Sequence, residues 1–152
     1  MIEVDEETKE VSGKHFLSRA YKNYQPTQEA SCYANRSFFS SACCKIIPID
    51  CINDQRFDMH IKRGEDSIFM YDISWNIKHV RITPPSCIYY VRKRHQSAGR
   101  RNTNFIINLY EFLSQSTKYT TMYFQHLTHR NPLFYLSRIA GTFSVSYTHL
   151  RA

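Results

Sequence analysis

The feature that most restricts how this chain can fold is an acid-free basic stretch at residues 89–101. Its five cationic side chains are Arg92, Lys93, Arg94, Arg100 and Arg101. Removing a guanidinium or ammonium from water without a partner costs several kcal/mol, so the stretch must lie on the surface or against an anion. Because the flanking segments are apolar enough to pack, we interpret it as a basic loop or strand edge displayed by a small core.

The aromatic residues in the basic stretch suggest nucleic acid as the anion. Lysine and arginine bind phosphates with release of counterions, and tyrosine and histidine rings can stack on unpaired bases. This combination is more typical of RNA or single-stranded DNA recognition than of duplex recognition. The candidate binding residues are therefore Tyr89, Tyr90, Arg92, Lys93, Arg94, His95, Arg100 and Arg101. The alternative is a basic loop that serves only solubility.

The distribution of charge supports an anionic partner more than the total does. Residues 1–72 carry nine Lys or Arg and twelve Asp or Glu, a net charge of −3. Residues 73–152 carry eleven Lys or Arg and one acid, Glu111, a net charge of +10. Together they give the net +7 of the whole chain. A strongly basic half attracts polyanions and raises their rate of association.

Two enzymatic alternatives stay open at this stage. In a metal-independent ribonuclease, His95 or His79 would act as general base and an arginine would stabilise the phosphorane. Asp58, His60 and Lys62 alternate along a predicted strand, which resembles the acid-and-lysine strand of metal-dependent nucleases of the restriction-enzyme type. Those sites carry an acid two residues before the lysine, where this chain has His60, a poor ligand for Mg²⁺. A solvated strand face is therefore favoured, and no metal, cofactor or enzyme class is assigned.

The central third of the chain predicts strands. Alternating or β-branched apolar residues occur at 43–52, 56–63, 67–72, 78–83 and 87–92, with turn residues between these segments. Short strands separated by turns favour an antiparallel sheet of four to five strands.

Helices are predicted before and after these strands in the sequence. Apolar residues at helical spacing predict an N-terminal helix within 13–24 and a second helix over 103–116, where Phe105, Leu109 and Leu113 share a face. Asn131-Pro132 predicts a further helix start, ending at Gly141. Residues 118–130 are ambiguous between strand and helix. The expected fold is α+β, with the 103–116 helix on the apolar face of the sheet.

The expected organisation is a single domain that is preceded by an acidic segment and followed by a short adapter-like tail. Residues 1–12 carry five acids and are interpreted as a solvated acidic lead-in or a short edge strand. Residues 13–144 form the domain. Residues 145–152 (VSYTHLRA) resemble, at all eight positions, one translated frame of a transposase-based sequencing adapter. That resemblance implies an artefactual tail and a domain truncated near Ser144.

Composition leaves a third interpretation open. Four glycines in 152 residues are few, while serine, tyrosine, histidine and cysteine are plentiful. A frame-shifted or antisense open reading frame without function would have a similar composition. The mutual consistency of the strand alternation, the capped helix and the charge asymmetry favours a genuine protein.

The predicted environment is the cytoplasm. Five cysteines, an odd number without a C-x-x-C pair, predict free thiols in a reducing compartment. The N-terminus is acidic where a signal peptide would be basic and then apolar, and no segment approaches the ~18 apolar residues of a membrane span. The sequence does not predict an oligomeric state.

Overall fold

The computed structural model describes residues 1–152 except 13–14, 26–30, 85, 94–103, 129–130 and 149–152. Its described part has an α+β fold with five α-helices and a three-stranded sheet. The helices are α1 (Phe16–Lys22), α2 (Ile49–Ile52), α3 (Glu65–Ile73), α4 (Phe105–Gln125) and α5 (Pro132–Thr148), with short 3-10 helices η2 (Arg36–Ser40) and η3 (Ser74–Asn76); the strands are β1 (Ile2–Asp5), β2 (Val11–Ser12) and β3 (Tyr90–Lys93).

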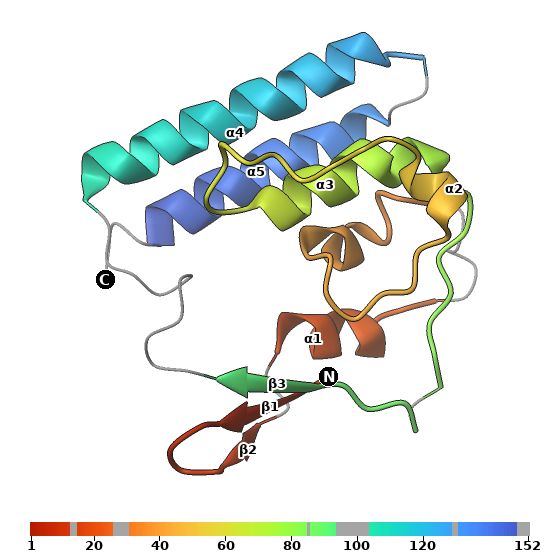
Figure 1. Ribbon diagram of the computed structural model, residues 1–152, viewed down its shortest axis with the longest axis vertical. Helices are drawn as coiled ribbons and strands as arrows, with labels where there is room; N and C mark the ends of the chain where they lie inside the picture. Colours follow the sequence, from red (N-terminus) through yellow and green to blue (C-terminus); the bar gives the residue numbers. More distant parts are fainter. Residues whose placement is uncertain (13–14, 26–30, 85, 94–103, 129–130, 149–152) are drawn as a thin grey trace.

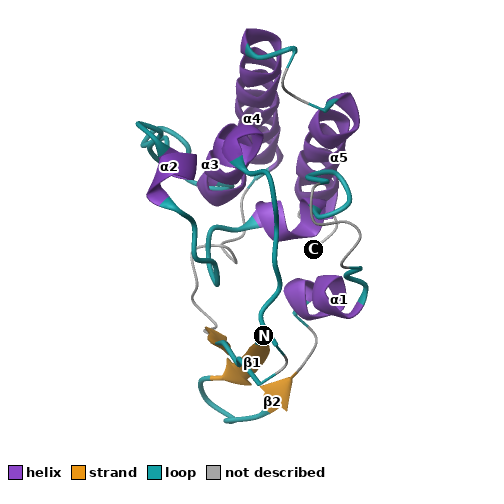
Figure 2. Cartoon of the chain, turned by 90° about the vertical axis from the view of Figure 1, so that its right-hand side faces the viewer, coloured by secondary structure: helices purple, strands orange, loops and turns teal. Residues whose placement is uncertain are grey.

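The sheet and the long helices occupy opposite ends of the molecule. Figures 1 and 2 show the small sheet at one end with α1 above it, while α3, α4 and α5 pack side by side at the other end. The prediction that the helix after the basic stretch covers the sheet was therefore wrong. That helix, α4, packs against α5 and α3 instead.

The expectation of a four- to five-stranded antiparallel sheet was also wrong. The described sheet has three strands in the order β2-β1-β3. β1 pairs antiparallel with β2 but parallel with β3, with Ile2 opposite Tyr90 and Asp5 opposite Lys93. The middle strand comes from the N-terminal residues, so the acidic segment forms backbone hydrogen bonds in the sheet.

The predicted central strands are mostly helix or irregular chain. Residues 67–72 belong to α3. Its side chains Ile68, Met70 and Tyr71 point in different directions from the helix, and all three are buried. Consecutive buried residues of this kind obscure the 3.6-residue pattern by which helices are recognised in a sequence. Gly64 caps its start with a φ of 79°, and acids follow in the first turn, where the helix dipole favours them. Residues 56–63 and 78–83 contain no strand.

The amphipathic helices were predicted at the right places. α1 lies within the predicted 13–24 segment, and α4 begins near the predicted start but continues to Gln125, which resolves most of the ambiguous region. The side chain of Asn131 caps α5 by accepting from the backbone N–H of Leu133 at 2.8 Å and of Phe134 at 3.2 Å. α5 does not end at Gly141 but continues to Thr148. A Cβ atom added at Gly141 would have no atom within 4 Å.

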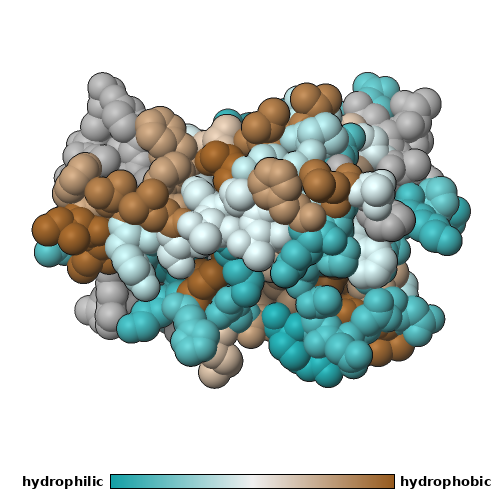
Figure 3. All heavy atoms as spheres, turned by 90° about the horizontal axis from the view of Figure 1, so that it is seen from above, coloured by the Kyte–Doolittle hydropathy of each residue, from teal (hydrophilic) through white to brown (hydrophobic). Residues whose placement is uncertain are grey.

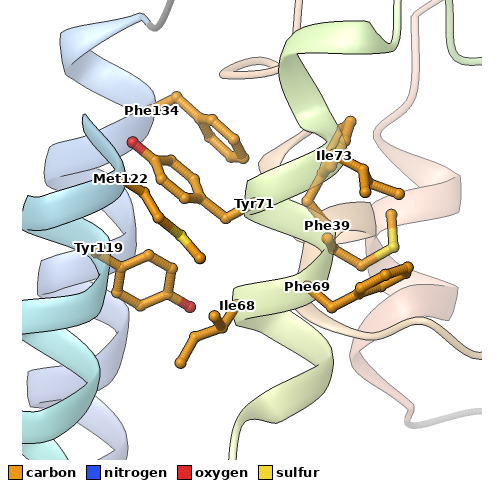
Figure 4. Packing of buried hydrophobic residues seen from close by; sticks show 9 residues of the cluster. Phe39, Ile68, Phe69, Tyr71, Ile73, Tyr119, Met122 and Phe134 are labelled. Atoms are coloured by element: carbon orange, nitrogen blue, oxygen red, sulfur yellow. The ribbon is translucent and has the colours of Figure 1, made fainter. Parts of the chain in front are cut away.

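The core is an aromatic cluster between α3, α4, α5 and η2. Tyr71 of α3 lies edge-on to Tyr119 of α4, with ring centroids 5.1 Å apart, and tilted against Phe134 of α5 at 5.4 Å. Phe39 of η2 lies edge-on to Phe134, with ring centroids 5.4 Å apart. Figure 4 shows Tyr71, Tyr119 and Phe134 together with Ile68 and Met122 on one side of α3, while Ile73 of the same cluster lies on its other side. This core lies apart from the three-stranded sheet.

Candidate nucleic-acid interface

The part of the basic stretch that the structure describes forms the edge strand β3. The N–H of Ile2 donates to the carbonyl of Tyr89 at 2.9 Å, and the N–H of Glu6 donates to the carbonyl of Lys93 at 3.1 Å. In a strand, backbone groups alternate in direction. The N–H and C=O groups of Tyr90 and Arg92 therefore point away from β1, toward the outer edge of the described sheet.

The strand register places an aromatic ring and a cation on one face. Tyr90 and Arg92 are two residues apart, so their side chains share a face, and their partners on that face are Ile2 and Val4 of β1. Tyr90 is 63% exposed, and Arg92 is exposed as well. The arrangement offers a flat ring for stacking beside a guanidinium that can bind a phosphate.

The two other described candidates flank this face. Tyr89 precedes β3 and is 45% exposed. Lys93 is exposed at the end of β3, on the opposite face from Tyr90. All four described candidates are thus accessible, as the free-energy cost of burying charge requires. The remaining candidates, Arg94, His95, Arg100 and Arg101, lie outside the described residues.

The sequence reasoning missed the acidic neighbour of this surface. Glu6 follows β1, and its Oε1 lies 3.5 Å from Nη1 of Arg92, with both side chains partly exposed. Asp5 has a different role: its Oδ1 accepts from the N–H groups of Glu7 and Thr8 at 3.0 and 3.1 Å and shapes the turn to β2. The clue in the sequence was the five acids of residues 1–12, a natural counterpart for an acid-free basic stretch.

A histidine before α1 interacts electrostatically with Glu3 of β1. His15 caps α1 by accepting at Nδ1 from the N–H of Leu17 at 3.2 Å. Burial lowers the pKa of this imidazole, and the carboxylate of Glu3 partly opposes that effect. His15 therefore adds less positive charge to this end of the molecule than an exposed histidine would.

A second candidate site is a hollow of about 330 Å³ between residues 55–60, α3 and α4. Nζ of Lys118 lies 2.9 Å from Oδ2 of Asp58, and this contact lowers the pKa of the carboxyl. The N–H of His60 donates to Oδ1 of the same residue at 3.0 Å and lowers the pKa further. The two charges neutralise each other, and the segment is not a strand. The resemblance to a nuclease strand therefore loses its geometric basis.

The hollow also shows which contacts the sequence could not indicate. Lys118 and Asp72 line it together with Asp58, although they are far apart in the chain. No local spacing identifies such a grouping.

The described part of the chain contains neither a metal-binding group of side chains nor a disulfide. It contains no group of three or more His, Cys, Asp or Glu side chains that could hold a metal ion. All five cysteines are described and none forms a disulfide. Burial raises the pKa of the Cys32 thiol, so this thiol is a poor nucleophile.

The remaining predictions for this protein concern histidine catalysis and membranes. His79 is exposed in the segment before β3, and the other candidate general base, His95, lies outside the described residues. None of the described helices combines the length and the hydrophobicity needed to cross a membrane.

Comparisons of the chain with protein-family models, with curated proteins and with solved structures gave no match.

Proposed function

We propose that this protein binds single-stranded nucleic acid, RNA in preference to duplex DNA, through the basic stretch at 89–101. The binding surface would comprise Tyr89, Tyr90, Arg92 and Lys93 together with Arg94, His95, Arg100 and Arg101. The observation that carries the proposal is the pairing of an exposed ring, Tyr90, with a cation, Arg92, on one face of an edge strand.

The chemistry of that face favours unpaired bases. A base has two π-faces that become accessible when it leaves a duplex, and stacking on an aromatic side chain contributes roughly 1–3 kcal/mol per base. Ile2 and Val4 beside Tyr90 extend the apolar surface on which a base could rest. Arg92 would then bind the adjoining phosphate. A duplex would offer its phosphates but not its base faces, so only the electrostatic part of the interaction would remain.

Replacing Tyr90 by leucine tests the stacking part of this proposal. Tyr90→Leu should lower affinity for a labelled single-stranded oligoribonucleotide by roughly 5- to 150-fold, because it removes the ring and no charge. Tyr21→Leu is the matched control, since Tyr21 is an exposed tyrosine on α1. Fluorescence anisotropy measures both affinities.

The same titrations separate the alternatives. Equal affinity of Tyr90→Leu and the unaltered protein would remove stacking and leave only a basic surface. Tighter binding of duplex DNA than of the single strand would contradict the stated preference. RNA that is shortened on a gel without added metal would indicate a ribonuclease instead of a binding module.

A further inference from the structure

Helix α4 turns its polar side toward the rest of the protein. Its only two charged residues, Glu111 and Lys118, are both held in ion pairs on that side: Arg63 lies 3.1 Å from Glu111, and Asp58 lies 2.9 Å from Lys118. Gln115 donates to the backbone carbonyl of Arg63 at 2.8 Å. Both charged groups of α4 are thus paired within the molecule.

The outward side of α4 is apolar from Ile106 to Leu113 and again at Phe124, with the exposed Thr117 and Thr121 between them. We call this surface the apolar stripe; it consists of Ile106, Leu109, Tyr110, Leu113 and Phe124, all between 43% and 75% exposed. Two residues of the predicted core-facing side, Leu109 and Leu113, lie in it instead of in the core. Figure 3 shows hydrophobic side chains in separate groups on the molecule seen from above, with less hydrophobic side chains between them. A helix face with this composition is ordinarily buried.

We propose that the apolar stripe of α4 is the contact surface for a second copy of this chain. The stripe contains no charged residue, so it offers nothing to select an acidic or a basic partner. Like faces in a symmetric dimer are complementary when both are neutral and apolar. Pairing through α4 also keeps the basic strand β3 away from the interface, since the two lie at opposite ends of the molecule.

The size of the stripe fits a dimer. At roughly 200 Å² for a large side chain, the exposed fractions of its five residues amount to on the order of 600 Å². The exposed Thr117 and Thr121 fill the gap between Leu113 and Phe124 and add to this area. The total approaches the ~800 Å² per partner of a standard stable interface. A helix of 21 residues, about 30 Å long, also supplies a contact of suitable length.

The test compares two isoleucine-to-glutamate variants by sedimentation equilibrium at tens of micromolar protein, without nucleic acid. The unaltered chain should be a dimer. Ile106→Glu should weaken self-association by at least roughly 100-fold, because the dimer would bury an unpaired carboxylate. Ile46→Glu is the matched control, since Ile46 is 99% exposed and lies outside the stripe. This variant should dimerise like the unaltered chain.

Each result decides for or against the dimer. Far-UV circular dichroism checks that both variants retain their helices, and Leu113→Glu is a second stripe variant if Ile106→Glu does not fold. A monomeric unaltered chain, or a dimer that survives Ile106→Glu and Leu113→Glu, would overturn the proposal. A monomer that floats with phosphatidylcholine vesicles would assign the stripe to a lipid surface and would equally overturn it.

Discussion

Glu6 is the residue that most directly opposes the proposed nucleic-acid contact. Its carboxylate lies 3.5 Å from the guanidinium of Arg92, so an incoming phosphate must compete with it. Exposed ion pairs of this kind are worth up to about 1 kcal/mol. The pair should therefore weaken phosphate binding without preventing it.

We expect Glu6→Gln to raise affinity for a single-stranded oligoribonucleotide by about two- to fivefold, because it frees Arg92 for phosphate. Anisotropy titrations at one salt concentration measure the change. Glu10→Gln is the matched control, because it removes the same charge from an exposed residue without an ion pair to Arg92. An equal gain in both variants would show that net charge, not the specific pair, sets the affinity.

Three elements meet at a buried arginine. Arg138 of α5 is 8% exposed and donates to the carbonyl of Arg36 at 3.0 Å and to the hydroxyls of Ser40 and Ser67 at 3.1 and 3.5 Å. These contacts join α5 to η2 and α3. Burial lowers the pKa of this guanidinium, and no carboxylate among the described residues pairs with it. Its Nε also has no hydrogen-bond partner in the described part.

The packing of Arg138 predicts that two substitutions at this position will lower the free energy of unfolding by different amounts. Arg138→Ala should lower the free energy of unfolding by about 2–4 kcal/mol, because it removes the buried stem and leaves a cavity. Arg138→Met should cost less than about 1.5 kcal/mol, because it fills the same volume and removes a desolvated charge. Urea denaturation followed by circular dichroism measures both values. Equal losses would indicate that the hydrogen bonds, not the packing, stabilise this junction.

The elements that the sequence predicted correctly are those with local signals. α1 and α4 show helical spacing of apolar residues, and Asn131-Pro132 starts α5 as expected. α3 has no such signal, because several of its consecutive residues are buried. These residues are mainly β-branched or aromatic, which are types that favour a strand prediction. The pairing of β1 with β3 joins residues about 90 positions apart, and no local pattern indicates it.

At the scale of the whole molecule, the basic strand β3 and the apolar stripe lie at opposite ends of the described structure. The sheet end carries the described part of the basic stretch, and the helical end carries the apolar stripe. The sequence predicted that the basic stretch must be accessible, because burying it costs too much. It did not predict the acidic counterpart in Glu6 or the outward direction of Leu109 and Leu113, since both depend on tertiary contacts.

The salt dependence of RNA binding tests the central claim most directly. If about four of the five cations in the basic stretch neutralise phosphates of a single strand, log K should fall against log salt with a slope near −3. Replacing Arg92, Lys93, Arg94, Arg100 and Arg101 together by glutamine should abolish binding while preserving the circular dichroism spectrum, because exposed charges contribute little to stability. A slope near zero, or undiminished binding by the folded glutamine variant, would contradict the account.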